Sequence, residues 1–218
     1  MKGDKIYPEI LSAFLIPQMT EEMKAELGIN ENHTSAGIVT ADIDDLIFIG
    51  MDEATKKANV KASYSKSFYA GGANSSSKLQ GEGLGIITGE SISEVKAGLD
   101  AILDFSESRV LYAVSCNDED SISYLVYTIA SIGSYFADDL KIEKGSSIAY
   151  LASPPVESIY ASDEALKASG AELAALYAPP TVTNTGGAIL TGSQSQCEAA
   201  CRAFAEAVQE VADNPVYR

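Results

Sequence analysis

The chain has 218 residues, 46% of them hydrophobic and 21% charged, which is typical of a folded globular protein. Its 31 acidic and 15 basic residues give a formal net charge of −16, which argues against nucleic acids and anionic membranes as partners because both attract a basic face. Three cysteines and no cleavable hydrophobic leader after Met1 indicate a reducing compartment, so we expect a cytoplasmic protein.

The sequence repeats itself, and the repeat organises the predicted elements. An apolar strand, a Thr-Gly pair and a helix begin at 86 and again 103 positions later, at 189. Matching blocks at 51–57 and 162–168 are 111 positions apart, so the first repeat holds eight extra residues. We assign these to the Gly- and Ser-rich stretch 70–83, which lacks periodicity. The chain thus divides into two domains, 1–107 and 108–218.

The first repeat is expected to open with a strand at 10–16 and a short helix at 21–27, capped by Thr20 and ended by Gly28. Strands are predicted at 35–40, 46–49 and 60–64, with a helical turn at Asp52. The irregular loop, a closing strand and a helix complete the repeat. A capping box, Ser91 with Glu94, marks the start of that helix.

In the second repeat we predict strands at 109–115, 147–152, 158–160 and 172–177, with a helical turn at Asp163. The uncharged stretch 122–137 carries an apolar stripe at helical spacing and is too short to span a membrane, so it is expected to form a core helix within 120–137. Ser193 and Gln196 form the second capping box. Together the repeats predict an α/β protein in which each domain is a mixed, ferredoxin-like sheet flanked by helices.

Patterns associated with catalysis or metal binding are incomplete. Cys197 and Cys201 are four residues apart on a helix, but no other Cys or His supplies the remaining ligands of a tetrahedral metal site. His33 is the single histidine, so a nucleophile activated by histidine would depend on it alone. The Ser75 to Lys78 motif lies in a Gly- and Ser-rich loop rather than at a helix start. We therefore expect no metal, no cofactor and no enzymatic activity.

The acidic stretch Asp42-Ile43-Asp44-Asp45 is the most prominent polar cluster, and two interpretations of it stay open. It is either a solvated turn or a site for a small cation, because adjacent carboxylates attract an ammonium group. Glu82 would join the site if the strand that it opens lies beside this turn.

Several motifs together resemble the tandem-domain bacterial microcompartment shell proteins of ethanolamine utilisation. They are the duplication, the Asp52-Glu53-Ala54-Thr55-Lys56 block, the helix starts after Thr88-Gly89 and Thr191-Gly192, the loop entries Tyr69-Ala70-Gly71-Gly72 and Tyr177-Ala178-Pro179-Pro180, and the Asn214-Pro215 end. The resemblance covers the chain from about residue 12 onward. It implies two circularly permuted shell domains per chain and a homotrimer that tiles with other shell proteins.

The resemblance also implies a large central pore that the irregular loops open and close, and a site where ethanolamine favours the closed pore. We expect the acidic turn to take this role, with Asp44, Asp45, Glu82 and Tyr112 as the ligand residues. The pore-gating residues that it suggests are Phe68, Tyr69, Gly71, Gly72, Asn74 and Lys78 in the first loop and Tyr177, Pro180, Thr183, Asn184, Gly186 and Gly187 in the second. Gly71, Gly72, Gly186 and Gly187 are expected to allow hinge-like changes.

A different class of function also fits two paired α/β units. Such units can bind a small molecule at their interface, so the chain could be a free-standing regulator with no shell role. Assembly into trimers that tile would distinguish a shell protein from this alternative.

Overall fold

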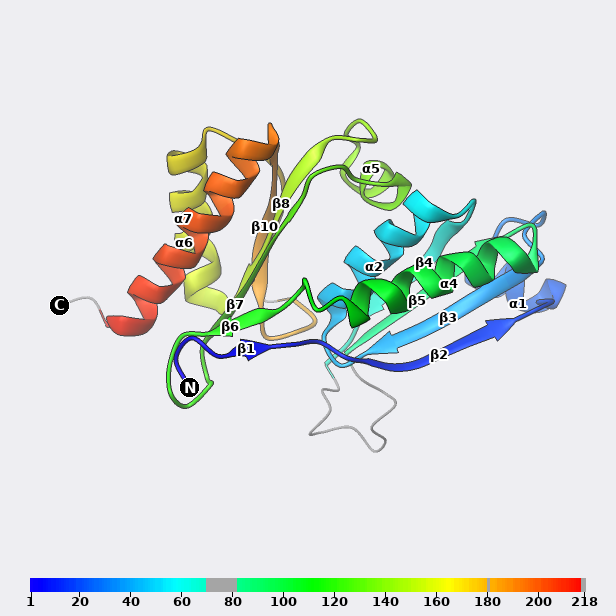
Figure 1. The fold of residues 1–218 in the computed structure, drawn as a ribbon, viewed down its shortest axis with the longest axis horizontal. Coiled ribbons are helices and arrows are strands. Elements are labelled where there is room, and N and C mark those ends of the chain that lie inside the picture. Colours follow the sequence, from blue (N-terminus) through cyan, green and yellow to red (C-terminus); the bar gives the residue numbers. More distant parts are fainter. Residues whose placement is uncertain (70–81, 180, 217–218) are drawn as a thin grey trace. The chain divides into compact units, whose positions relative to one another are not determined.

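The computed structural model describes residues 1–69, 82–179 and 181–216, which divide into two compact units (Figure 1). The first-repeat unit comprises Pro8–Val110 together with Gly133–Asp139. The second-repeat unit comprises Met1–Tyr7, Leu111–Ile132 and Leu140–Arg218. Each unit therefore contains one repeat and a short segment from the other half of the chain.

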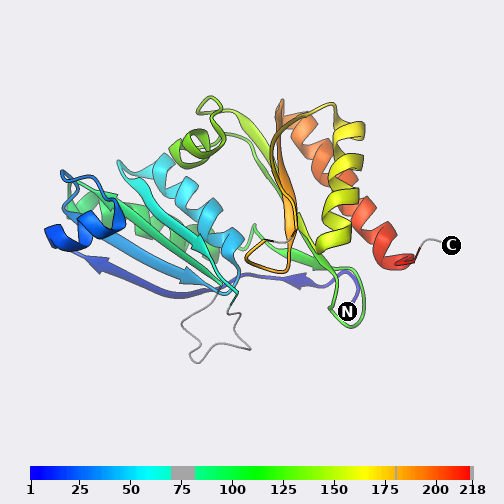
Figure 2. The ribbon, with the colours of Figure 1, turned by 180° about the vertical axis from the view of Figure 1, so that it is seen from behind.

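The first-repeat unit is built on a four-stranded antiparallel sheet. Its strands, in spatial order, are β2 (Ile10–Ile16), β3 (Ser35–Ala41), β5 (Gly83–Gly89) and β4 (Lys61–Ser67). Its own helices are α1 (Glu21–Leu27), α2 (Asp44–Lys57) and α4 (Ile92–Glu107). Helices α2 and α4 pack against each other and against the sheet, and Figure 2 shows the same unit from behind, with α1 at the end of β2.

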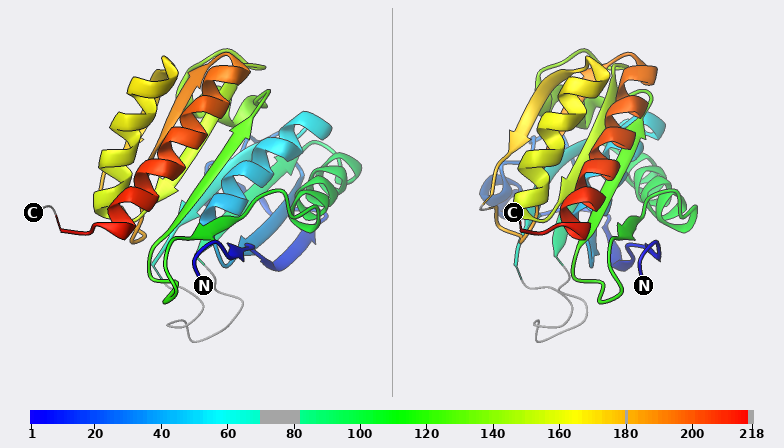
Figure 3. Two further views of the ribbon diagram at one scale, coloured as in Figure 1. Left: turned by 60° about the vertical axis from the view of Figure 1, so that its left-hand side comes forward. Right: turned by 90° about the vertical axis from the view of Figure 1, so that its left-hand side faces the viewer.

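The second-repeat unit has a six-stranded sheet, again antiparallel at every pairing that the structure describes. Its order is β1 (Lys5–Ile6), β6 (Ala113–Ser115), β7 (Ser123–Ile129), β8 (Ser147–Ser153), β10 (Gly186–Gly192) and β9 (Glu172–Tyr177). Helices α6 (Pro155–Ser169) and α7 (Gln194–Asp213) lie side by side on this sheet (Figure 3). Phe204 of α7 is fully buried in the core between them.

Two features of the predicted sheets are corrected. The described sheets are antiparallel rather than mixed. The apolar runs at 46–49 and 158–160 belong to helices α2 and α6 rather than to strands. Leu46, Ile47 and Ile49 of α2 are fully buried. Because this short run has no polar residue at helical spacing, its sequence cannot be told from that of a buried strand.

The predicted core helix at 120–137 is also wrong. Its first part is strand β7, and only the end belongs to the short helix α5 (Ser134–Leu140). The apolar residues fit helical spacing, but Tyr124, Val126, Tyr127 and Ile129 are β-branched or aromatic residues that favour a pleated strand. No helix in the described part of the chain has both the length and the apolar character for a membrane crossing.

The predicted helix ends are largely confirmed. The Thr20 side chain accepts a hydrogen bond from the Met23 N–H, and Gly28 ends α1 in the left-handed conformation, with φ of 65°. Ser193 and Gln196 form a complete capping box at the start of α7. In α4 only half of the predicted box forms, because the Glu94 carboxylate accepts from the Asn59 N–H at 2.7 Å instead.

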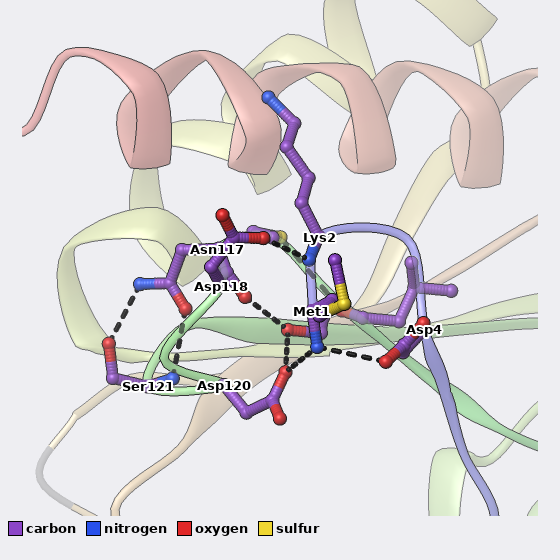
Figure 4. A network of polar contacts seen from close by, with 10 residues as sticks. Met1, Lys2, Asp4, Asn117, Asp118, Asp120 and Ser121 are labelled. Atoms are coloured by element: carbon purple, nitrogen blue, oxygen red, sulfur yellow. Dashed lines mark hydrogen bonds and ion pairs between the residues drawn. The ribbon is translucent and has the colours of Figure 1, made fainter.

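The first residues of the chain are held in the second-repeat unit by β1 and by a polar network (Figure 4). The Met1 amino group lies 2.9 Å from an Asp4 carboxylate oxygen and 2.8 Å from one of Asp120. The Lys2 N–H donates to Asp118 at 3.1 Å, and the Lys2 ammonium pairs with Asp213 at 2.7 Å. These contacts raise the pKa of the Met1 amino group to about 10, chiefly through the Asp120 hydrogen bond. Because the groups are exposed, the network contributes little stability.

Helix α5 comes from the second repeat but docks in the first-repeat unit through Asp52. The Asp52 carboxylate is fully buried and accepts hydrogen bonds from the N–H groups of Gly133, at 2.8 and 2.9 Å, and of Phe136, at 3.2 Å. Thr55 Oγ1 accepts from the Ser134 N–H at 3.0 Å. A Cβ at Gly133 would come within 2.2 Å of Thr55 Oγ1, so only glycine permits this approach. Asp52 on α2 thus supplies the N-terminal cap that α5 lacks.

Replacing Asp52 with alanine tests this contact, because it leaves buried N–H groups of α5 without an acceptor. We expect Asp52→Ala to lower the free energy of unfolding by about 2 to 4 kcal/mol. The matched control is Asp163→Ala at the repeat-equivalent position, where the side chain is 62% exposed and pairs with Lys167. Chemical denaturation of both variants is the measurement, and equal effects would show that Asp52 does not hold α5.

Candidate functional site

The predicted acidic turn spans the junction of β3 and α2. Strand β3 ends at Ala41, Ile43 is the N-cap of α2 with no side-chain cap, and Asp44 and Asp45 form the first turn of the helix. Only Asp42 and Ile43 therefore lie in a turn, which corrects the predicted extent. Carboxylates in a first helical turn are favoured by the positive end of the helix dipole.

Glu82 joins this cluster, as the sequence hypothesis required. Ala41 pairs with Gly83 in the sheet, and the Glu82 N–H donates to the Ala41 carbonyl at 2.8 Å. A Cβ added at Gly83 would lie 2.8 Å from the Asp44 Cα, so glycine lets the first turn of α2 rest directly on β5. The sheet register and this close approach together bring Glu82 beside Asp44.

Asp42 has a structural role that the sequence did not indicate. Its carboxylate accepts a hydrogen bond from the Glu9 N–H at 2.7 Å, and its own N–H donates to the Glu9 carbonyl at 3.2 Å. This reciprocal pair ties the residue before β2 to the end of β3. No sequence pattern relates positions 33 residues apart in this way, so only the fold reveals the contact.

Burial raises the pKa of each of three carboxyl groups in the cluster. For Asp44, which is 9% exposed, burial is the main cause, and a hydrogen bond from the Ser67 side chain lowers the pKa only in part. The pKa of Asp42 is raised by burial against the lowering effect of the Glu9 N–H. The pKa of Glu82 is raised by burial and then by the negative charges of Asp44 and Asp42. The cluster therefore gathers carboxyl groups whose ionised forms are disfavoured by burial.

Such a cluster offers carboxylate oxygens to which an ammonium group could donate hydrogen bonds. Among the described residues, no group of three or more His, Cys, Asp or Glu side chains has an arrangement that could hold a metal. An ammonium group offers three donors to carboxylate oxygens and needs no fixed coordination geometry. Asp45 is half-buried and follows Asp44 in the first turn of helix α2.

The fourth predicted ligand residue, Tyr112, belongs to the second-repeat unit. Its ring packs edge-on against Tyr7 with centroids 5.8 Å apart, and the Lys5 ammonium lies 4.0 Å from its centroid. A participation of Tyr112 in the acidic site stays a prediction.

The predicted pore loops are described only in part. Gly71, Gly72, Asn74, Lys78 and Pro180 lie outside the described residues. Phe68 is half-buried, whereas Tyr69 and Tyr177 are 59% and 45% exposed.

Hydroxyl groups organise the second loop. Thr181 Oγ1 donates to the carbonyls of Thr183 and Thr185 at 2.8 and 2.7 Å, and Asn184 lies exposed between these residues. The loop therefore has a defined local structure on the side that precedes β10.

Gly186 and Gly187 lie in strand β10 rather than in the irregular loop. Both are buried, and neither has a positive φ. A Cβ at Gly187 would lie 1.9 Å from the Leu151 carbonyl oxygen, and one at Gly186 would lie 2.7 Å from both Ser158 Oγ and Pro179 Cγ. Close packing at the base of the second loop therefore requires glycine at both positions, and their role as hinges stays a prediction.

The residues considered for catalysis or metal binding have structural surroundings. Cys197 and Cys201 are buried in the second-repeat core, and burial raises the pKa of Cys201 to about 11, which disfavours the reactive thiolate. His33 Nδ1 lies 2.7 Å from Thr88 Oγ1, and burial lowers the His33 pKa. Both observations agree with side chains that serve packing rather than chemistry.

Replacing Glu82 with glutamine tests whether the ionised Glu82 carboxylate destabilises the folded protein. A carboxyl whose folded-state pKa is raised destabilises the folded protein once it ionises, and this cost is absent below its ordinary pKa of 4.5. Glu82→Gln should therefore raise the stability at pH 7 by up to about 1 kcal/mol, and the gain should disappear as the pH falls below 4.5.

The measurement is thermal or chemical unfolding of the variant and parent between pH 4 and 8. The control is Glu119→Gln, an exposed turn residue of the second-repeat unit, which should change stability little at any pH. A Glu82→Gln variant less stable than the parent at pH 7 would show that the ionised Glu82 side chain does not destabilise the folded protein.

Comparisons with known proteins identify relatives over the full chain. The chain is 49% identical over 216 residues to the bacterial microcompartment shell protein EutL of Clostridium perfringens, and the match covers 99% of both chains. It matches the crystal structure of the ethanolamine utilization protein EutL from Leptotrichia buccalis with a TM-score of 0.96 and 50% identity, covering 100% of each chain.

A more distant match concerns the fold alone. The trimeric bacterial microcompartment shell protein PduB aligns with a TM-score of 0.75 and 17% identity, covering 94% of this chain and 89% of that one. No protein-family model matches the chain.

Proposed function

Because the chain belongs to the EutL family of bacterial microcompartment shell proteins, a family of structural rather than catalytic proteins, we propose that three copies form a ring-shaped tile of the shell. Each chain contributes two similar units, so a trimer places six units around one axis. The same fold occurs in PduB, which is described as trimeric. Such a tile would join other shell proteins, and the irregular loops before β5 and β10 would line its central pore.

The acidic cluster is the proposed site for ethanolamine. Ethanolamine carries an ammonium group for the carboxylates and a hydroxyl group that can donate or accept a hydrogen bond. The observation that supports this proposal is the raised pKa of Asp42, Asp44 and Glu82, because a bound cation would stabilise the ionised carboxylates that burial disfavours. Asp45 and Tyr112 are the further candidate contacts.

The position of Glu82 would couple ligand binding to the pore. Glu82 comes directly after the stretch 70–81, and its carbonyl accepts from the Phe68 N–H at 2.9 Å, so it joins the two ends of the first loop. A ligand held by Glu82 and α2 would favour the loop conformation in which both are in place. Such a ligand shifts the pore equilibrium only by its differential affinity for the two states, and one charge-assisted contact worth about 1.5 to 3 kcal/mol changes a population ratio by about ten- to a hundredfold.

Calorimetric titration with ethanolamine tests the site. We expect Glu82→Gln and Asp44→Asn each to weaken binding by about ten- to a hundredfold, because each removes one charge-assisted hydrogen bond. Binding should also weaken as the pH falls toward the raised pKa values of Asp44 and Glu82, since protonation removes the charges that hold the ammonium. Ethylene glycol, which lacks the ammonium, is the ligand control and Glu119→Gln the protein control. Unchanged ethanolamine affinity in both site variants would exclude this site.

Assembly is tested by light scattering of the purified protein. We expect a mass of about three times the 23.0 kDa of one chain. Because every chain carries a formal charge of −16, association at low protein concentration should strengthen with added salt, which screens the repulsion between copies. A monomer at all protein and salt concentrations would contradict the proposed shell role and favour a free-standing binding protein.

A further inference from the structure

The second-repeat unit contains a polar cavity of about 330 Å³, at the lower end of the range of ligand pockets. It lies where β10 ends and α7 begins, beside the end of α6 and the start of β9. Its lining residues are polar side chains and glycines: Ser146, Gly170, Glu172, Thr191, Gly192 and Gln196. The cavity is separate from the acidic cluster, which belongs to the first-repeat unit.

Strand register identifies the equivalent place in the first repeat. In the first sheet Lys61 pairs with Thr88. In the second sheet Glu172 pairs with Thr191, and Thr191 follows Thr88 by the 103 positions of the strand repeat. The cavity therefore corresponds to the surroundings of Thr88.

In the first repeat, the imidazole ring of His33 occupies this place. His33 Nδ1 lies 2.7 Å from Thr88 Oγ1, which in turn lies 2.6 Å from Ser63 Oγ. Thr88 is fully buried as a result. The ring and the two hydroxyl groups thus form one hydrogen-bonded chain.

The second repeat has a glycine at the position of this histidine. Strands β3 and β8 begin at equivalent positions, because the partners of their first residues, Ser35 and Ser147, differ by the same 103 positions. Two residues before each of these lie His33 and Gly145, which are therefore counterparts. Gly145 supplies no side chain, so the place of the ring is open and forms part of the cavity.

The hydroxyl partner of the threonine is also lost in the second repeat. Ser63 and Ala174 are counterparts, because each is the extra residue of a bulge in an edge strand. Thr191 is accordingly half-buried, and its hydroxyl donates to the Ser147 carbonyl at 3.0 Å. Thr191 Oγ1 can therefore accept a hydrogen bond from a ligand N–H.

The charge beside this place is reversed between the repeats. Burial is the main cause that lowers the pKa of His33, and the positive charge of Lys61 acts in the same direction. Glu172 stands at the position of Lys61, and as the cross-strand partner of Thr191 its side chain lies on the same face of the sheet. A carboxylate at this position would stabilise a protonated ring.

We propose that this cavity binds a ligand with an imidazole ring in its protonated form, one ring N–H donating to Thr191 Oγ1 and the other to the Glu172 carboxylate. The ligand takes the place that the chain's own His33 has in the first repeat. The volume leaves room for a substituent on the ring. This inference needs neither the trimer nor the ethanolamine site, so its failure leaves the proposed function standing.

A titration of the full-length protein with imidazole alone is the first test. We expect a dissociation constant of about 1 mM, because a ligand of so few atoms gains little binding free energy. The amide signals of Gly170 and Gly192, which line the cavity, report binding in protein-observed NMR. Signals that stay unchanged up to about 10 mM imidazole would overturn the inference.

An exchange of charge between the repeats tests the role of Glu172. Glu172→Lys, which introduces the residue of the first repeat, should weaken imidazole binding by about tenfold or more, because it removes a charge-assisted hydrogen bond. Lys61→Glu is the matched control and should leave the affinity unchanged, since His33 fills that place. Both side chains are exposed, so the fold should tolerate the changes. Equal affinities of the Glu172→Lys variant and the parent would overturn the inference.

Removing the native ring tests the equivalence of the two places. His33→Ala should open a cavity in the first repeat that binds a second imidazole, seen as a shift of the Gly89 amide signal. Imidazole should then raise the thermal unfolding midpoint of this variant more than that of the parent. A folded variant with no shift at Gly89 would overturn the equivalence on which the inference depends. If the variant misfolds, the result for Glu172→Lys decides alone.

A histidine blocked at both ends, N-acetylhistidine methylamide, distinguishes the two sources of an imidazole ring. If it binds as tightly as imidazole, the cavity accepts a histidine side chain presented by another protein. If imidazole alone binds, the cavity takes a free heterocyclic molecule. Binding of neither compound would overturn the inference.

Discussion

The buried carboxylate of Asp52 holds together parts of the chain that lie far apart in sequence. It binds the N–H groups of Gly133 and Phe136, so a helix from the second repeat becomes part of the first-repeat unit. Burying a carboxylate is costly unless hydrogen bonds and charge partners compensate it, and here backbone donors and Lys56, at 3.3 Å, do so. Because Gly133 admits no side chain at this approach, the contact is specific to one segment.

In the acidic cluster, by contrast, burial disfavours the ionised form of the carboxyl groups. Asp44 and Glu82 are brought together by sheet register and by the approach of α2 to Gly83, and their pKa values are raised chiefly because burial removes water from the carboxylates. An arrangement that costs stability in the free protein would favour a ligand that supplies a positive charge. This combination of rigid backbone and unfavourable charge is the physical basis of the proposed ethanolamine site.

Duplication has left two similar units with different local chemistry. The acidic first turn of α2 corresponds to Pro155 and Val156 at the start of α6, so the charge cluster has no equivalent there. Conversely, Asp52 is fully buried against α5, whereas its counterpart Asp163 is exposed. The two units therefore differ in charge and burial at equivalent positions, although their four equivalent strands share one order.

The sequence by itself determined the duplication, the strands and helix caps set by local chemistry, such as Thr20 and Gly28, and the family resemblance that full-length relatives confirm. These features depend on neighbouring residues or on patterns that repeat along the chain. Only the tertiary structure decided that Glu82 lies beside Asp44 and that Asp52 caps α5, because both result from strand register and packing between distant segments. It also decided that the apolar runs at 46–49 and 122–129 are helix and strand respectively, since a fully buried helix segment has no polar face and the apolar residues of β7 also fit helical spacing.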